Sequence, residues 1–383
     1  MTSSWAVPDV HFSAAQRSAS AEVVRRELGG PDVVGFAFLG GSLAVGLGHA
    51  TSDVDLYAVS DDLPADEIVH ESGGVTVHVS TVRADTVRKL VDLATEYRAT
   101  GASRDQLYLD LKSLSTLVRL TTGLRVVVTP AWQSVLDGLR RDVVRKIFIA
   151  RDSNGFVASA EDVAGSLAVG DRYTALGAST LALEFAAEAA LAAADDLYWG
   201  PKFLLRRMAR TTATAPWAPV VWRLLANAFP AGPPDDLDQV RRIAEQRLHV
   251  GNLLISCCAL EGWDRPLTRL PSPDEVGVQT RSPYFAPIRF TDGWALQGPE
   301  HAYEVNEATV RLWRDLTPTA AGPGPAALAA IGAVGSNPPL AGAPVPPVPD
   351  LPADLRLRWA PRYAIHPRAE RPMDAVHSNG GGT

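Results

Sequence analysis

Cysteine is nearly absent from this chain of 383 residues. Its two cysteines, Cys257 and Cys258, are adjacent within an apolar run. Two adjacent cysteines cannot form a disulfide framework, and they do not have the ligand spacing of a zinc site. The sequence therefore excludes disulfide-rich scaffolds and cysteine-based zinc modules.

Long hydrophobic runs and an excess of positive charge are also missing. No apolar run has the length needed to span a bilayer. The N-terminal residues lack the basic segment and apolar core of a secretory signal. We therefore expect a cytoplasmic protein that does not act in a membrane. The formal net charge is −7, which argues against work on long nucleic acid, because such proteins need a basic surface.

Residues 35–59, GFAFLGGSLAVGLGHATSDVDLYAV, are the most informative stretch. An apolar run predicts a strand that ends at Gly41 and Ser42. Ten residues later a second predicted strand carries Asp53 and Asp55. Side chains two positions apart on a strand point to the same face. We therefore expect the two carboxylates to lie together, while the apolar residues that alternate with them face a core.

The chemistry of this pair points to a bound cation. Two neighbouring carboxylates repel each other unless a cation lies between them, and hard oxygen ligands suit Mg²⁺, which often also binds substrate phosphates. The glycine-rich turn leaves backbone N–H groups uncovered, and such groups can bind phosphate oxygens. Together these features predict a nucleoside triphosphate site.

Gly41, Ser42, Asp53 and Asp55 resemble the motif of the nucleotidyltransferase superfamily that contains DNA polymerase beta, kanamycin nucleotidyltransferase and the cyclic-oligonucleotide synthases. The shared pattern is Gly-Ser, roughly ten residues, then Asp-x-Asp between apolar residues. The resemblance implies that Asp53 and Asp55 are ligands of two Mg²⁺ ions. It also implies that Gly41 and Ser42 hold the phosphates of ATP or another nucleoside triphosphate, and that pyrophosphate leaves the α-phosphorus.

The third carboxylate of that superfamily is missing from its usual place on the next strand. In the apolar-acid-apolar triplet expected there, His78 takes the position of the acid. Three interpretations remain open. His78 could be the general base, because a neutral imidazole accepts a proton near pH 7. An acid from elsewhere, such as Asp105 or Asp110, could complete the site. The protein could also be catalytically degenerate and only bind nucleotide.

Cations for the triphosphate are expected from residues 195–210, DDLYWGPKFLLRRMAR. Several relatives carry a lysine on a bundle helix that faces the phosphates, and the resemblance gives this role to Lys202. Arg206 follows four residues later, which would place it one turn along the same helical face. Tyr198 and Trp199 are candidates for stacking on the base.

The overall pattern predicts an α+β protein in four parts. A small mixed-sheet nucleotidyltransferase core would span residues 1–130. A bundle of four or five helices would follow over 131–263, with a break between helices at 152–155. A hairpin-helix module would occupy 264–316, and the Pro-, Ala- and Gly-rich residues 317–383 are expected to form a largely disordered tail.

Residues 288–315 are expected to form two short strands and a helix capped by Asn306. This pattern is faintly similar to PqqD-like peptide-recognition domains, which bind a peptide by strand addition. Residues 355–365 could return as one more strand.

The sequence thus predicts a Mg²⁺-dependent nucleotidyltransferase. It would move AMP from ATP to a hydroxyl of a small molecule or peptide. The first alternative is a degenerate nucleotidyltransferase fold that serves as a nucleotide- or peptide-binding module. The second is a synthase of cyclic or linear oligonucleotides.

Overall fold

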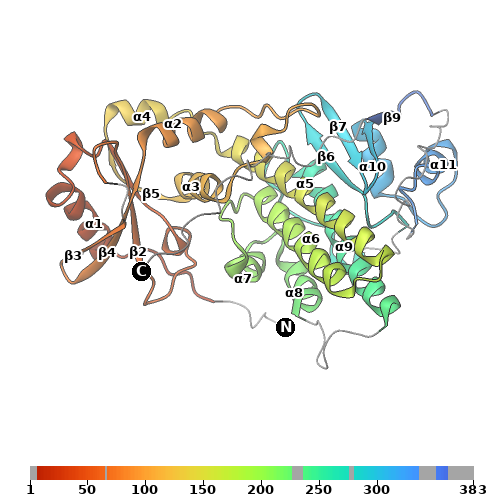
Figure 1. The fold of residues 1–383 in the computed structure, drawn as a ribbon, viewed down its shortest axis with the longest axis horizontal. Helices are drawn as coiled ribbons and strands as arrows, with labels where there is room; N and C mark the ends of the chain where they lie inside the picture. The colour runs from red at the N-terminus through yellow and green to blue at the C-terminus, as the bar shows by residue number, and fades with distance from the viewer. Residues whose placement is uncertain (1–6, 65–66, 227–235, 276–279, 336–350, 361–383) are drawn as a thin grey trace, which may run out of the picture.

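The computed structural model describes residues 7–64, 67–226, 236–275, 280–335 and 351–360. Within these residues the chain has an α+β fold, as predicted. A five-stranded sheet lies at one end of the molecule, a helical bundle in the middle, and a four-stranded sheet at the other end (Figure 1).

The first sheet is mixed, with strand order β3-β4-β2-β1-β5. Its strands are β1 (Phe36–Leu39), β2 (Val54–Val59), β3 (Glu67–Ser72), β4 (Val75–Val82) and β5 (Leu124–Val128). The central strand β2 is antiparallel to β1 and parallel to β4. The sequence did not predict β3 or β5. Both are edge strands, and β3 alternates between exposed and half-buried residues, so it has no continuous apolar run that would mark it.

Helices cover both faces of this sheet. Val54 and Leu56 of β2 are buried against helix α1 (Ala14–Arg26), which confirms the core-facing side of the motif. Phe38 and Tyr57 point to the opposite face and join a cluster with α2 (Ala84–Leu93), α3 (Leu111–Thr122) and α4 (Pro130–Leu136). The two aspartates of the motif therefore lie on the side of the sheet that faces α3.

The middle of the molecule is helical. Its elements are α5 (Arg141–Ala168), α6 (Arg172–Ala193), α7 (Leu204–Arg210), α8 (Ala218–Ala226) and α9 (Leu237–Glu261). The expected break at 152–155 is wrong, because α5 runs through it. The polar residues there have partners inside the fold: Asp152 pairs with Arg151, and Asn154 accepts a hydrogen bond from Arg104. Gly155 lets the Phe185 ring approach the helix.

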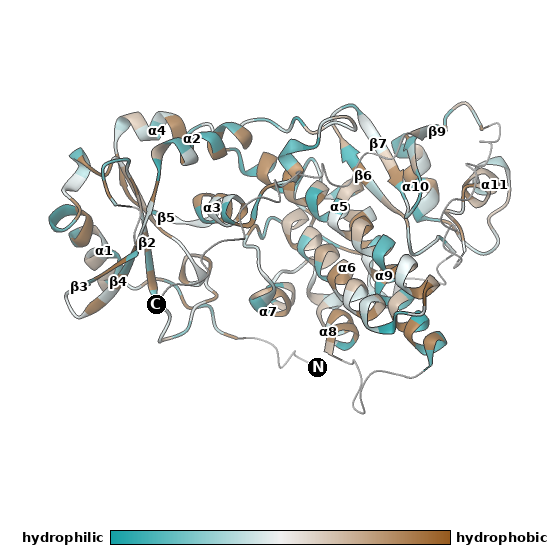
Figure 2. Ribbon diagram, in the orientation of Figure 1, coloured by the Kyte–Doolittle hydropathy of each residue, from teal (hydrophilic) through white to brown (hydrophobic). Residues whose placement is uncertain are grey.

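Contrary to the expectation from the sequence, one helix of the described residues, α6, is long and apolar enough to cross a membrane by length and composition alone. Figure 2 shows it as a mainly pale and brown helix. However, 67% of its most apolar window is buried inside the fold. That degree of burial is typical of a core helix, whose apolar surface is covered by neighbouring helices.

The second sheet has strand order β6-β7-β8-β9 and is antiparallel throughout. Its elements are β6 (Ala286–Phe290), β7 (Gly293–Gln297), β8 (Ala302–Val305) and β9 (Leu357–Ala360), with α10 (Glu307–Arg314) after β8. Asn306 caps α10 by accepting from the N–H of Thr309, as predicted. The module has one strand more than the two expected before the helix, and β9 confirms the returning strand. Its likeness to peptide-recognition domains stays a prediction.

The expected disorder does not hold for residues 317–335. Helix α11 (Pro323–Ala330) forms there, and it buries Ala327 and Leu328 in the same cluster as Trp313. A short Pro- and Ala-rich segment can therefore be ordered when it covers a large aromatic side chain. Residues 336–350 and 361–383, where the prediction of disorder also falls, lie outside the described residues.

Candidate functional site

A cavity of about 280 Å³ lies where the first sheet meets the helical bundle. Five of the predicted site residues line it: Gly41, Ser42, Asp53, Asp55 and Lys202. The two predicted stacking residues, Tyr198 and Trp199, also line it. The rest of the wall consists of His49, Thr51, Ser52, Ser115, Val118, Arg119 and Phe203. The turn, the acidic strand and the basic segment of the sequence prediction thus line one solvent-open cavity.

Two glycines bring the turn into contact with the acidic strand. The N–H of Gly40 donates to the carbonyl of Asp55 at 3.0 Å. Gly41 has φ +80°, a conformation that favours glycine, and a Cβ on it would stand 2.6 Å from Oδ2 of Asp55. A Cβ on Gly40 would stand 2.8 Å from the Tyr57 ring. Only residues without side chains allow this close approach.

The backbone after these glycines offers free donors. Ser42 begins a short 3₁₀ turn (Ser42–Val45), so its N–H has no partner earlier in a helix. Among the described residues, no acceptor takes the N–H of Gly41 or of Ser42. These N–H groups belong to residues of the cavity wall, where an anionic oxygen could accept from them.

The two carboxylates lack partners. Asp53 is exposed and Asp55 is half-buried. Within the part of the chain that the structure describes, neither side chain has a hydrogen bond or an ion pair. Burial raises the pKa of Asp55 above its ordinary value, the guanidinium of Arg119 opposes that rise, and the charge of Asp53 adds to it. The site therefore holds negative charge that a bound cation would stabilise.

Arg119 is a site residue that the sequence reasoning missed. It extends from α3, and its guanidinium carbon lies 4.9 Å from the centre of the Tyr57 ring. Its charge acts on both Asp55 and Tyr198. Apart from this ring contact, no described residue forms an ion pair or a hydrogen bond with its side chain. The signal in the sequence was a lone arginine in the apolar helix LSTLVRLTT, but only the packing of α3 on the sheet brings it to the cavity.

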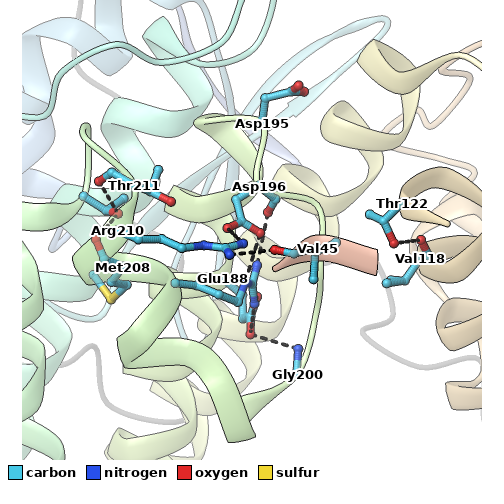
Figure 3. A network of polar contacts seen from close by, with 12 residues as sticks. Val45, Val118, Thr122, Glu188, Asp195, Asp196, Gly200, Met208, Arg210 and Thr211 are labelled. Carbon is cyan, nitrogen blue, oxygen red and sulfur yellow. Dashed lines mark hydrogen bonds and ion pairs between the residues drawn. The ribbon is translucent and has the colours of Figure 1, made fainter. Parts of the chain in front are cut away.

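Buried charged side chains fix the position of the segment that precedes Lys202. The N–H of Gly200 donates to Glu188 of α6 at 3.1 Å, and Arg207 of α7 donates to the same carboxylate at 2.8 Å. Arg207 also donates to Asp196 at 3.1 Å. Figure 3 shows Glu188, Asp196 and Gly200 drawn together by these contacts. The network fixes both ends of residues 196–200 and so positions the residues that follow at the cavity.

Lys202 and Arg206 do not share a helical face. Lys202 lies in a 3₁₀ turn (Pro201–Phe203) that precedes α7, so the spacing of four residues does not align them. The exposed Lys202 ammonium lies 5.0 Å from the Phe203 ring centre. Arg206 instead donates to the carbonyls of Leu47 at 2.9 Å and Gly46 at 3.1 Å. The structure therefore gives Arg206 contacts that differ from the prediction: it ties α7 to the loop after Ser42.

His78 lies beside Asp55 in the register of the parallel strands β2 and β4. It is not among the described residues that line the cavity, and its Nδ1 lies 3.9 Å from Oε1 of Glu67 on the edge strand. Asp110 caps α3 with its carboxylate, and Asp105 does not line the cavity either. The role of His78 as a general base stays a prediction.

The residues present fit one hard divalent cation better than two. Asp53 and Asp55 are the carboxylates among the described residues of the cavity wall. The described residues also contain no group of three His, Cys, Asp or Glu side chains arranged to hold a metal ion. Mg²⁺ is commonly bound by one or two carboxylates together with substrate phosphates, and that donor set agrees with this cavity.

No protein-family model matches the chain, and no curated protein matches it in sequence. Among solved structures, it is similar to a nucleotidyltransferase-like protein from Exiguobacterium sibiricum, with a TM-score of 0.37 and 12% sequence identity. The alignment covers 64% of this chain and 78% of that protein. A likeness this distant carries no argument about function.

Proposed function

We propose that this chain is a Mg²⁺-dependent nucleotidyltransferase that moves AMP from ATP to a hydroxyl group of a small molecule or peptide and releases pyrophosphate. One observation carries the proposal. The unpaired carboxylates of Asp53 and Asp55 share a single cavity with the free N–H groups of Gly41 and Ser42 and with the cation of Lys202. Transfer from a nucleoside triphosphate requires carboxylate ligands for a metal ion and hydrogen-bond donors for the phosphates within one cavity.

Each residue has a chemical task in this proposal. Asp53 and Asp55 would hold Mg²⁺, which neutralises phosphate charge and makes an attacking hydroxyl more acidic. The N–H groups of Gly41 and Ser42 would donate to phosphate oxygens. Lys202 would add positive charge, which stabilises the negative charge that builds up on the departing pyrophosphate.

Two further residues of the wall fit the nucleotide. Arg119 is a second cation without an ion pair among the described residues, and it lies on the face of the sheet that carries Asp55. Tyr198 presents an aromatic ring, on which a base can stack. We propose a small-molecule or peptide acceptor in the cytoplasm, with neither a membrane nor a long nucleic acid as partner, because a net charge of −7 disfavours a polyanion.

The test is pyrophosphate release from each nucleoside triphosphate in the presence of pooled hydroxyl compounds and peptides, with Mg²⁺ or with a chelator. We expect Mg²⁺-dependent release with ATP and loss of it in Asp53→Asn. The matched control is Asp85→Asn on α2, whose carboxylate is exposed, pairs with Lys89 and lies outside the cavity wall. Equal release by wild type and Asp53→Asn would contradict the proposal.

The second candidate is a nucleotide-binding module without turnover. Two observations favour it. His78 occupies the position where the superfamily has its third carboxylate, and the described wall of the cavity contains two carboxylates. Such a module would bind Mg²⁺ and ATP and release no pyrophosphate with any acceptor. An oligonucleotide synthase, in contrast, would form product from nucleotides alone.

A further inference from the structure

A second cavity, also of about 280 Å³, adjoins the first. Trp199 lines both cavities. The residues that follow it divide between them: Lys202 and Phe203 face the first, whereas Pro201 and Leu204 face the second. A ligand in the second cavity would therefore contact the same indole ring as a nucleotide in the first.

The wall of the second cavity is mainly apolar. It includes Phe185 and Leu204 together with two leucines at the surface, Leu181 of α6 and Leu111 at the start of α3. Leu181 is 52% exposed and Leu111 is 70% exposed. Large apolar side chains on a concave wall favour a ligand with an apolar body, because its burial removes their surface from water.

The charges around this cavity do not balance. Glu188 is paired with Arg207, and Arg151 is paired with Asp152 at 2.5 Å. The half-buried Glu184 has no hydrogen bond or ion pair with any described residue. Burial raises the pKa of Glu184, and the charge of Glu188 adds to that rise. A ligand that brings one positive charge would stabilise the Glu184 carboxylate.

We propose that the second cavity binds the acceptor, and that the acceptor is a small apolar amine with a hydroxyl group. Its ammonium would pair with Glu184, and its apolar body would lie between Leu181, Phe185 and Trp199. This inference rests on the proposed function for the transfer step, and it names the substrate class.

The hydroxyl would then reach the first cavity past Trp199. Its oxygen forms a bond to the α-phosphorus of ATP, and the bond from that phosphorus to the pyrophosphate oxygen breaks. The pyrophosphate keeps the electron pair, and the hydroxyl proton passes to solvent.

The cavity can be tested without nucleotide. Binding of phenethylamine, 2-phenylethanol and 3-phenylpropanoate is measured by calorimetry in the absence of ATP and Mg²⁺. The three probes share an aromatic ring and differ in charge. We expect phenethylamine to bind about ten-fold tighter than 2-phenylethanol, and 3-phenylpropanoate to bind most weakly.

Two variants test whether the preference for phenethylamine arises in the second cavity. Glu184→Gln should remove the advantage of phenethylamine and leave 2-phenylethanol unchanged. Leu181→Lys should weaken phenethylamine and 2-phenylethanol, because it places a charged side chain in the apolar wall. Tyr173→Lys is the matched control, because Tyr173 is 67% exposed on the same helix and does not line the cavity. Thermal melting checks that each variant is folded.

The outcomes separate this inference from the proposed function. Failure of every probe to bind folded wild type, equal binding of the three probes, or equal effects of Leu181→Lys and Tyr173→Lys would overturn the acceptor site. Phenethylamine binding that survives in Asp53→Asn supports the cavity by itself. Absence of ATP binding in wild type, together with phenethylamine binding, would overturn the nucleotidyltransferase function and the acceptor role, and would leave an amine-binding cavity.

Discussion

Substitution of Gly41 by alanine perturbs the contact between the turn and the acidic strand. Gly41 has φ +80° and ψ −166°, a region that costs a residue with a side chain about 1–3 kcal/mol. The new Cβ would also stand 2.6 Å from Oδ2 of Asp55. Either the turn or the carboxylate must move. We expect Gly41→Ala to lower the free energy of unfolding by about 2 kcal/mol and to displace Asp55.

A control substitution at Gly74 separates the effect of backbone strain from the effect of displacing the Asp55 carboxylate. Gly74 has φ +76°, and a Cβ on it would meet nothing within 4 Å. Gly74→Ala should therefore cost about 1–2 kcal/mol from the left-handed backbone alone and leave the site intact. Denaturant unfolding gives the stabilities, and calorimetry gives the affinity for ATP with Mg²⁺.

We expect only Gly41→Ala to lose that affinity. The reasoning would be refuted if Gly41→Ala kept the wild-type affinity within about two-fold. It would also be refuted if Gly74→Ala lost as much affinity as Gly41→Ala.

Three further predictions concern single side chains. Burial raises the pKa of Asp55 above 3.8, so the native state holds this proton to higher pH than the unfolded state. The free energy of unfolding therefore falls as pH rises from about 3.8 through the native pKa of Asp55, and this contribution is constant above it. Asp55→Asn should raise the free energy of unfolding at pH 7 and flatten its dependence on pH in that window, and unchanged stability would contradict the burial argument. Lys202→Met should weaken ATP binding far more than AMP binding. Arg206→Met is the control, which should lower the melting temperature and keep the ratio of the ATP and AMP affinities. Equal losses of ATP and AMP binding in Lys202→Met would mean that Lys202 only packs. His78→Ala should slow turnover by about 10²-fold while nucleotide affinity stays near wild type if the imidazole is the base, and an unchanged rate would remove it from the mechanism.

The parts of the site that depend on neighbouring residues could be predicted from the sequence. The spacing of Asp53 and Asp55 predicts that their side chains share a face. Gly41 lies against Asp55 because the consecutive strands β1 and β2 pair in the sheet. Their motif is compact enough that no distant contact is needed to interpret it.

The parts of the site and of the fold that depend on packing between distant segments could not be predicted from the sequence. Arg119 reaches the cavity because α3 packs on the sheet. The spacing of Lys202 and Arg206 suggested one helical face, but a 3₁₀ turn intervenes. Helix α5 continues through 152–155, where Asp152 pairs with its neighbour Arg151 and Asn154 accepts a hydrogen bond from Arg104. The second of these contacts joins residues 50 positions apart, so it could not be predicted from the local sequence.

The most direct test of the central claim is calorimetric binding of ATP with and without Mg²⁺, on wild type and on the Asp53→Asn/Asp55→Asn double variant. We predict Mg²⁺-dependent binding in wild type and loss of that binding in a double variant that remains folded. Absence of binding in folded wild type, or equal binding by the double variant, would contradict a nucleotide site built on these two carboxylates.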